Sequence, residues 1–237
     1  MKWVQIIDNF FYPQYEKNWD DQLFRKRVLQ IINPDSYLLD VGAGAGIIVA
    51  MNFRGECQRV CGVDLDHRVL DNPFLDHGQI SNARKLPYSD ASFDVVIADN
   101  VMEHLDHPEE VFSEIARVLR PGGKLLFKTP NRRHYMPLIA RLTPHRFHQW
   151  INRKRGRNAS DTFPTHYLCN SSAQIKKIAD QTGLNIETIE LIEGRPEYLR
   201  INTFTYIFGL IYERLVNYIP FLAQFRILLI VRLSKPE

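Results

Sequence analysis

The chain has 237 residues, of which 45% are hydrophobic and 24% charged, and its formal net charge is +3. These values are ordinary for a globular protein and predict one domain with a sizeable core. Three cysteines form no even disulfide framework and indicate a reducing compartment, so we expect a cytoplasmic protein. No uncharged apolar run reaches the ~18 residues of a membrane span, and residues 1–10 do not resemble a signal peptide.

The first predicted strand, Tyr37–Val41, leads into a loop with glycine at every second position: Gly42, Gly44 and Gly46. Residues 47–53 predict a helix after this loop. A strand, a glycine turn and the start of a helix are the parts of a nucleotide-type site. A second buried strand, Val60–Asp64, ends in a carboxylate 20 positions after Gly44. An acid at this place accepts hydrogen bonds from ribose hydroxyls.

The glycine spacing and the acid before the loop indicate which ligand binds. A dinucleotide fingerprint has its third glycine three residues after the second, whereas this chain has Ile47 there. Asp40, two residues before the first glycine, suits a ligand with a cationic group rather than a pyrophosphate. A ribose and an amino-acid ammonium together indicate S-adenosylmethionine.

More strands and a helix follow in alternation. Residues 78–81 predict a short third strand before Asn82-Ala83, and Phe93–Ala98 predicts a fourth that ends at Asp99. The helix Pro108–Leu119 has proline at its start and two acids in its first turn, and Lys124–Lys128 is the fifth strand. Ligands of open α/β sheets bind beyond the carboxyl ends of the strands, so residues 99–104 should line the site.

Five landmarks in this order resemble the class I S-adenosylmethionine-dependent methyltransferases, in particular the type 11 group that includes the quinone-biosynthesis O-methyltransferases. The resemblance covers the cofactor half of the chain and fades after Pro130. The landmarks are Asp40–Gly46, Gly62–Asp64, Leu86-Pro87 with Ser92–Val96, Glu103–Leu105 and Leu119–Gly123.

The resemblance implies an α/β, Rossmann-like sheet of seven strands, mostly parallel with an antiparallel last strand, and helices on both faces. We expect a single domain over residues 1–237. Its parts are a helical cap (1–36), a cofactor-binding core (37–130), a basic lid inserted after strand five (131–170) and an apolar helical insertion between strands six and seven (195–225). A helix over Ser171–Thr182 and strands over Asn185–Glu190 and Arg226–Leu233 complete the fold.

The resemblance also implies which residues bind S-adenosylmethionine, whose product is S-adenosylhomocysteine. Asn82 stands where relatives commonly have aspartate, and its side-chain oxygen can accept from the adenine amino group. An N-terminal helix closes over the cofactor in the family, so Tyr12, Tyr15 and Trp19 either face the sulfonium or pack the helix down. The predicted cofactor-binding residues are Asp40, Gly42, Ala43, Gly44, Gly46, Asp64, Leu65, Asn82, Ala83 and Asp99.

His104 is the candidate general base for an acceptor hydroxyl, because an imidazole with an ordinary pKa of ~6.5 suits neutral pH. A structural histidine bonded to backbone is the alternative. The weaker candidates for acceptor binding are His134, Tyr135, His166 and Tyr167. The end of strand four lacks the Asn/Asp-Pro-Pro-aromatic stretch of adenine or glutamine N-methylation. The chain also has no Pro-Cys turn for cytosine methylation.

Residues 131–160 carry eight basic side chains and no acid, which leaves 22 basic against 27 acidic residues in the rest of the chain. A basic lid suits an anionic substrate, a phospholipid surface or nucleic acid, and a merely solvated surface is the alternative. Its histidines His134, His145 and His148 lack acidic or cysteine companions, so we expect no metal.

The insertion at residues 195–225 is strongly apolar. It covers a substrate pocket, forms a homodimer face, rests on a membrane or packs as a helical hairpin. The favoured function is O-methylation of a small-molecule, anionic or lipid-linked acceptor by a cytoplasmic enzyme with peripheral membrane contact. The alternatives are a non-catalytic S-adenosylmethionine-binding protein and an RNA methyltransferase that uses the basic lid. Nucleic acid is disfavoured because the chain has no separate RNA-binding domain.

Overall fold

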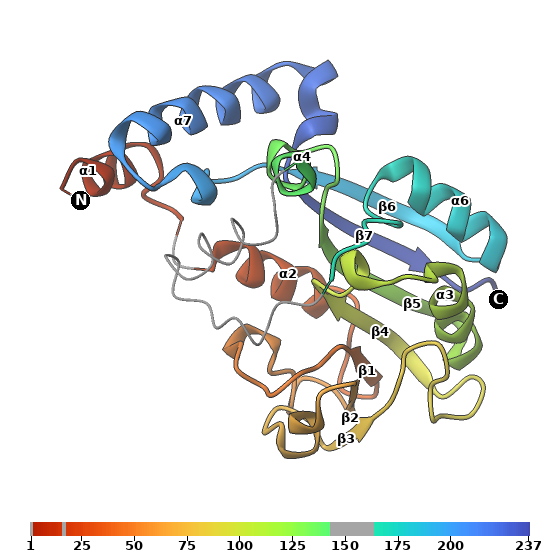
Figure 1. Cartoon of the computed structure of the whole chain (residues 1–237). Helices are drawn as coiled ribbons and strands as arrows, with labels where there is room; N and C mark the ends of the chain where they lie inside the picture. The colour runs from red at the N-terminus through yellow and green to blue at the C-terminus, as the bar shows by residue number, and fades with distance from the viewer. Residues whose placement is uncertain (1, 16–17, 143–163) are drawn as a thin grey trace. The chain divides into compact units, whose positions relative to one another are not determined.

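The computed structural model describes residues 2–15, 18–142 and 164–237. Its centre is a seven-stranded sheet in the order β3-β2-β1-β4-β5-β7-β6 (Figure 1). β1 to β5 pair in parallel, and β7 is antiparallel to β5 and β6, as the sequence predicts. The strands are β1 (Tyr37–Val41), β2 (Arg59–Asp64), β3 (His77–Ile80), β4 (Phe93–Asp99), β5 (Leu119–Pro130), β6 (Asn185–Ile192) and β7 (Leu228–Ser234).

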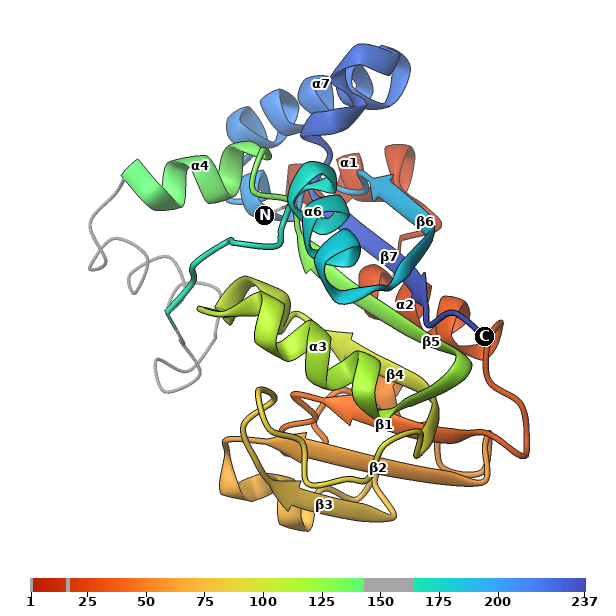
Figure 2. The same ribbon diagram turned by 90° about the vertical axis from the view of Figure 1, so that its right-hand side faces the viewer.

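Helices cover both faces of this sheet. α3 (Pro108–Val118) and α6 (Ser172–Thr182) lie on one face, and α2 (Trp19–Leu29) lies on the other (Figure 2). The central strands are therefore continuous apolar runs, and Leu38 of β1 and Val96 of β4 are fully buried. This core holds the carboxyl ends of β1, β2, β4 and β5 at one edge of the sheet.

Local sequence signals set the ends of α3 and α6. Pro108 occupies the first turn of α3, followed by two acids that complement the positive end of the helix dipole. The Ser171 hydroxyl caps α6 by accepting the Gln174 N–H at 3.4 Å. Gly183 ends α6 in the left-handed conformation with φ +70°. Both helices were predicted within one residue of these bounds.

Two predicted extents are wrong. Residues 47–53 contain only a three-residue 3₁₀ helix, η1 (Val49–Met51), instead of a full helix. Ile47 and Val49 are 74% and 76% exposed, and only Ala50 and Phe53 of this stretch are buried, so apolar burial is too small to stabilise a longer helix. β5 begins at Leu119 rather than Lys124, because Gly122 and Gly123 pair through backbone hydrogen bonds with Lys235.

The chain forms two compact units. Unit 2 comprises Asn18–Thr129, His166–Glu190 and Ile230–Glu237 and contains most of the sheet. Unit 1 comprises Met1–Lys17, Pro130–Thr165 and Leu191–Leu229. Residues 143–163, which form most of the predicted basic lid, lie outside the described residues. The helices of unit 1 are α1 (Lys2–Phe11), α4 (Tyr135–Leu142), η5 (Glu197–Leu199), α7 (Thr203–Tyr218) and η6 (Pro220–Phe225).

The apolar insertion forms one long helix, α7, followed by η6. The Asn202 side chain caps α7 through the Thr205 N–H at 3.0 Å. Gly209 allows close packing, because a Cβ there would lie 2.8 Å from the Cβ of Pro196. The Tyr12 hydroxyl donates to buried Glu213 at 3.0 Å. Tyr12 therefore packs inside unit 1. No helix in the described part of the chain is long and apolar enough to cross a bilayer.

Candidate functional site

Three carboxylates stand at the carboxyl ends of neighbouring strands in unit 2. Asp40 of β1 lies opposite Gly62 of β2 and Ile97 of β4, and Asp64 and Asp99 are the last residues of β2 and β4. Burial, together with the charges of Asp99 and Asp64, raises the pKa of Asp40 to about 8. A cation bound beside these groups would relieve their repulsion. This edge of the sheet therefore favours a cationic ligand.

The first glycine of the loop is required by geometry. Gly42 has φ +81°, and a Cβ there would lie 2.2 Å from Cγ2 of Val101. A side chain at this position would displace Val101 and strain the backbone. The Gly42 N–H donates to the carbonyl oxygen of Val63 at 2.8 Å, which ties the loop to β2.

Asp64 joins the glycine loop to the turn after β2. Its Oδ2 accepts the Gly44 N–H at 2.8 Å, and its Oδ1 accepts the Asp66 N–H at 2.9 Å. Asn72 supports the same loop by donating to the carbonyl oxygens of Ala43 and Gly44 at 3.0 and 3.1 Å. Each Asp64 oxygen retains a lone pair for a further donor such as a ribose hydroxyl.

Asp99 holds a buried oxygen that nothing in the described chain satisfies. Its Oδ1 lies 3.0 Å from Nζ of Lys128 and accepts from Nδ2 of Asn100 at 2.9 Å. Its Oδ2 has no hydrogen-bond partner among the described residues. Burial raises the pKa of Asp99 to about 6, while Lys128 acts against this rise. An unpartnered buried carboxylate oxygen is costly, so a ligand donor is the natural partner of Oδ2.

Lys128 is the fully buried counter-ion of this edge. Its Nζ lies 2.5 Å from Oδ1 of Asp21 and 3.1 Å from Oδ2 of Asp20, in addition to its contact with Asp99. These carboxylates raise the pKa of Lys128, so it stays charged despite its burial. Since both aspartates belong to the first turn of α2, Lys128 attaches that helix to the ends of β4 and β5.

The residues that we predict to contact the adenine of the cofactor follow β2 and β3 and are largely exposed. Leu65 is 65% exposed and offers an apolar surface next to Asp64. Asn82 is exposed too, and its side-chain oxygen accepts the Arg84 N–H at 3.0 Å. This oxygen already has one partner in the turn, so an adenine amino group would be its second donor. Ala83 lies in the same turn.

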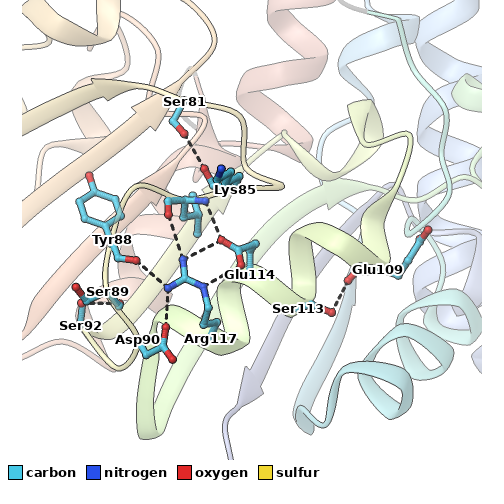
Figure 3. Close-up of polar contacts among 11 residues, drawn as sticks. Ser81, Lys85, Tyr88, Ser89, Asp90, Ser92, Glu109, Ser113, Glu114 and Arg117 are labelled. Carbon is cyan, nitrogen blue, oxygen red and sulfur yellow. Dashed lines mark hydrogen bonds and ion pairs between the residues drawn. The ribbon is translucent and has the colours of Figure 1, made fainter.

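The loop that follows Asn82 is fixed to α3 by Arg117. The guanidinium donates to the carbonyl oxygens of Tyr88 and Leu86 at 2.8 and 3.1 Å, and to the Asp90 carboxylate at 2.8 Å. Glu114 completes the cluster by pairing with Arg117 and accepting the Leu86 N–H at 2.9 Å (Figure 3). The Leu86-Pro87 landmark is therefore a structural anchor for the loop.

The candidate base, His104, ends the 3₁₀ helix η3 (Met102–His104) just after β4. Its side chain is 32% exposed, and its Nε2 lies 4.0 Å from Oε1 of buried Glu103. Burial raises the pKa of Glu103. Thr129 donates its hydroxyl to Oε2 of Glu103 at 2.9 Å and accepts from Nδ2 of Asn170 at 2.6 Å.

The four acceptor-binding candidates divide between the units. In unit 2, the His166 and Tyr167 N–H groups both donate to the Glu103 carbonyl oxygen, at 2.7 and 3.2 Å. They therefore lie beside His104 in the fold. His134 and Tyr135 belong to unit 1, where the two rings pack with centroids 4.0 Å apart. His134 is 1% exposed, and burial lowers its pKa to about 3.

A family model described as a methyltransferase domain matches residues 14–189. The chain belongs to this methyltransferase family. A ubiquinone biosynthesis O-methyltransferase of Nitrosococcus oceani is 30% identical over 173 residues, which cover 59% of this chain and 73% of that protein. A probable S-adenosylmethionine-dependent methyltransferase of Mycolicibacterium smegmatis is 39% identical over 107 residues, 42% of this chain and 40% of the relative.

The solved structures show the same fold. The crystal structure of the [4+2]-cyclase SpnF has a TM-score of 0.59 and covers 94% of this methyltransferase and 85% of its own chain. Its sequence is only 18% identical, so this likeness concerns the fold alone.

S-adenosylmethionine is the cofactor of this enzyme family. The donor set of unit 2 fits it: the orphaned Oδ2 of Asp99 and the buried carboxyl of Asp40 suit the methionyl ammonium, and Asp64 suits the ribose. When bound, the cofactor supplies a methyl group already activated on a sulfonium. The protein residues then have to hold the acceptor in line and, if the acceptor is a hydroxyl, take its proton.

Sequence reasoning missed Lys128 and Asn170, and it placed Glu103 among the residues that line the site without giving its carboxyl a role. The available signal for Lys128 was a lone lysine at the end of an apolar strand, where only a paired charge can be buried. Nothing in the sequence near Asn170 indicates that it reaches Thr129. Among the described residues, no three His, Cys, Asp or Glu side chains gather closely enough to hold a metal ion.

Proposed function

We propose that this methyltransferase methylates a hydroxyl oxygen of a small, lipid-linked acceptor, with His104 as the general base. The observation that carries the proposal is the Glu103-His104 pair at the end of β4, where an imidazole with a partly exposed side chain stands 4.0 Å from a buried carboxylate. His104 would take the hydroxyl proton of the acceptor, and the Glu103 side chain lies beside the ring that receives it. The N. oceani relative, named as an O-methyltransferase of ubiquinone biosynthesis, supports this class of acceptor.

The cofactor half is tested first by titrating S-adenosylhomocysteine into wild type, Asp64→Ala and Asp71→Ala by calorimetry. Asp71 is an exposed carboxylate of η2 and serves as the matched control. We expect wild type and Asp71→Ala to bind alike, and Asp64→Ala to lose at least tenfold in affinity because it lacks the carboxylate that would accept from the ribose hydroxyls. Equal binding by Asp64→Ala would remove Asp64 from the cofactor site.

The chemical step is tested with methyl-labelled S-adenosylmethionine and membrane lipid extracts as the acceptor pool. We expect label in an O-methyl lipid product, and a loss of at least 100-fold in kcat for His104→Gln with unchanged S-adenosylhomocysteine binding. His107→Gln is the control, because this neighbouring histidine is exposed. Label transferred to RNA instead would favour the nucleic-acid alternative. Tight cofactor binding with no transfer to any pool would favour a non-catalytic protein.

A further inference from the structure

One face of α7 is apolar and unpartnered. Buried positions repeat at helical spacing on its inner side through Tyr206, Gly209, Glu213 and Val216. On the other side, the large apolar side chains are between 46% and 88% exposed. A helix that buries one stripe normally presents polar residues to water on the other. We define the α7 face by the exposed residues Phe204, Ile207, Phe208, Ile211, Leu215 and Tyr218.

Neighbouring elements of unit 1 also expose large apolar side chains. α1 contacts α7 (Figure 1). Trp3 and Phe10 of α1 are 68% and 76% exposed, and Phe221 of η6 is 76% exposed. Of the 23 large apolar side chains that are exposed in the described chain, 15 belong to unit 1. Unit 1 is nevertheless the smaller unit. Scattered apolar residues are normal, but such a concentration marks an interaction surface.

The acids of α1 and α7 are both paired with other side chains of unit 1. Glu213 is the only acid of α7 and is buried, where it accepts from Tyr12 and Asn217. The only acid of α1, Asp8, pairs with Arg200 at 2.5 Å. Arg214 of α7 has a side chain that is 55% exposed, and its Nε lies 3.4 Å from Oε2 of Glu213. A partner of this face therefore meets apolar and cationic groups.

The formal charge of the chain is divided between the two units. Unit 1 holds 14 Lys and Arg against 6 Asp and Glu, a net charge of +8, and unit 2 holds 16 against 21, a net charge of −5. Two copies that docked through this face would bring together two bodies of +8. An anionic lipid surface instead attracts them, by about 1 kcal/mol for each basic residue near it.

We propose that the α7 face docks onto an anionic lipid bilayer, with α7 lying in the plane of the interface. Amphipathic helices bind in this way, with aromatic and aliphatic side chains inserted among the acyl chains and basic residues at the headgroups. The apolar face favours lipid over RNA, whose binding needs charge and stacking but no exposed aliphatic surface. The proposal extends the lipid-linked acceptor proposed above, because such a surface would bring the enzyme to the compartment of its substrate.

The test is flotation of the full chain with vesicles of phosphatidylcholine alone and of phosphatidylcholine mixed with phosphatidylglycerol. We expect wild type to float with the mixed vesicles and Phe204→Ser/Phe208→Ser to lose at least tenfold in partitioning. Leu29→Ser/Leu70→Ser is the matched control, because it removes two exposed leucines from unit 2. It should float like wild type.

Three results would overturn the proposal: no flotation of wild type, equal flotation of Phe204→Ser/Phe208→Ser, or a wild-type dimer that this double variant makes monomeric while no chain floats. Binding of RNA in place of vesicles, unchanged in the double variant, would also overturn it. Calorimetric binding of S-adenosylhomocysteine by the same variants is a separate readout. It shows whether they are folded and keeps a failure of the lipid surface distinct from a failure of the methyltransferase site.

Discussion

At the residue scale, Asp40 should make cofactor binding depend on pH. Burial and two neighbouring carboxylates raise its pKa to about 8 in the free protein, so it is mostly protonated at pH 7. An ammonium beside it favours the ionised form, so S-adenosylhomocysteine has to displace the proton below pH 8. We expect affinity to rise by up to tenfold for each pH unit between pH 6 and about 8, and to level off above. Calorimetry in buffers of different ionisation enthalpy measures both the slope and the released proton.

The control for this pH dependence is Asp40→Asn, which cannot ionise. It should bind S-adenosylhomocysteine more weakly and with a nearly flat profile in the same range. A flat profile in wild type would contradict the placement of the ammonium beside Asp40.

The contrast between Asp40 and Lys128 shows which site residues a sequence can reveal. Asp40, Asp64 and Asp99 stand at the ends of apolar runs, so their place at one sheet edge follows from strand order alone. The partners of Lys128 cannot be found this way, because Asp21 precedes it by 107 residues and contacts it only in the folded chain. The orphaned Oδ2 of Asp99 depends on side-chain geometry and has no sequence signal at all.

At the element scale, Lys128 should decide how firmly α2 is held against the sheet. Lys128→Met removes the buried cation that pairs with three carboxylates, Asp20 and Asp21 of α2 and Asp99 of β4. We expect a loss of about 3–5 kcal/mol in the free energy of unfolding at pH 8, measured by urea denaturation. Without the cation, the folded pKa of Asp99 rises further above its unfolded value, so the folded variant binds more protons and its stability falls as pH rises. The loss should therefore be smaller at pH 5 than at pH 8.

Lys85→Met provides the comparison for this variant, because Lys85 is an exposed lysine of the same unit. It should change stability by less than about 0.5 kcal/mol at either pH. An equal loss at pH 5 and pH 8 in Lys128→Met would mean that packing of the lysine stem, and not its charge, holds α2.

The elements were predictable where a strong local pattern coincides with burial. α3 has proline, acids and apolar residues in register, and its bounds agree within one residue. The stretch after the glycine loop also has apolar residues, but tertiary packing leaves Ile47 and Val49 exposed and only η1 forms. Periodicity cannot show whether an apolar face will find a partner. The same uncertainty applied to α7, whose apolar residues fit a packed hairpin and an exposed face equally well.

At the scale of the whole molecule, the basic character of residues 131–160 was evident in the sequence, but the division into units was not. Unit 1 is assembled from three segments, Met1–Lys17, Pro130–Thr165 and Leu191–Leu229, and its charge of +8 emerges only when they are added together. The composition of one continuous stretch of sequence does not show which distant segments will associate in the folded chain.

This division of charge predicts that lipid binding depends on where a charge is changed and not only on the total. Arg132→Glu/Arg133→Glu lowers the net charge of unit 1 from +8 to +4. Lys176→Glu/Lys177→Glu makes the same change of four charges on exposed residues of α6 in unit 2. We expect the first variant to lose at least tenfold in binding to phosphatidylglycerol-containing vesicles at ~0.1 M salt, and the second to lose less than threefold. The difference should shrink at ~1 M salt, where screening acts within about 3 Å. Equal losses in the two variants would show that the overall charge of the protein, rather than the charge of unit 1, draws it to the bilayer.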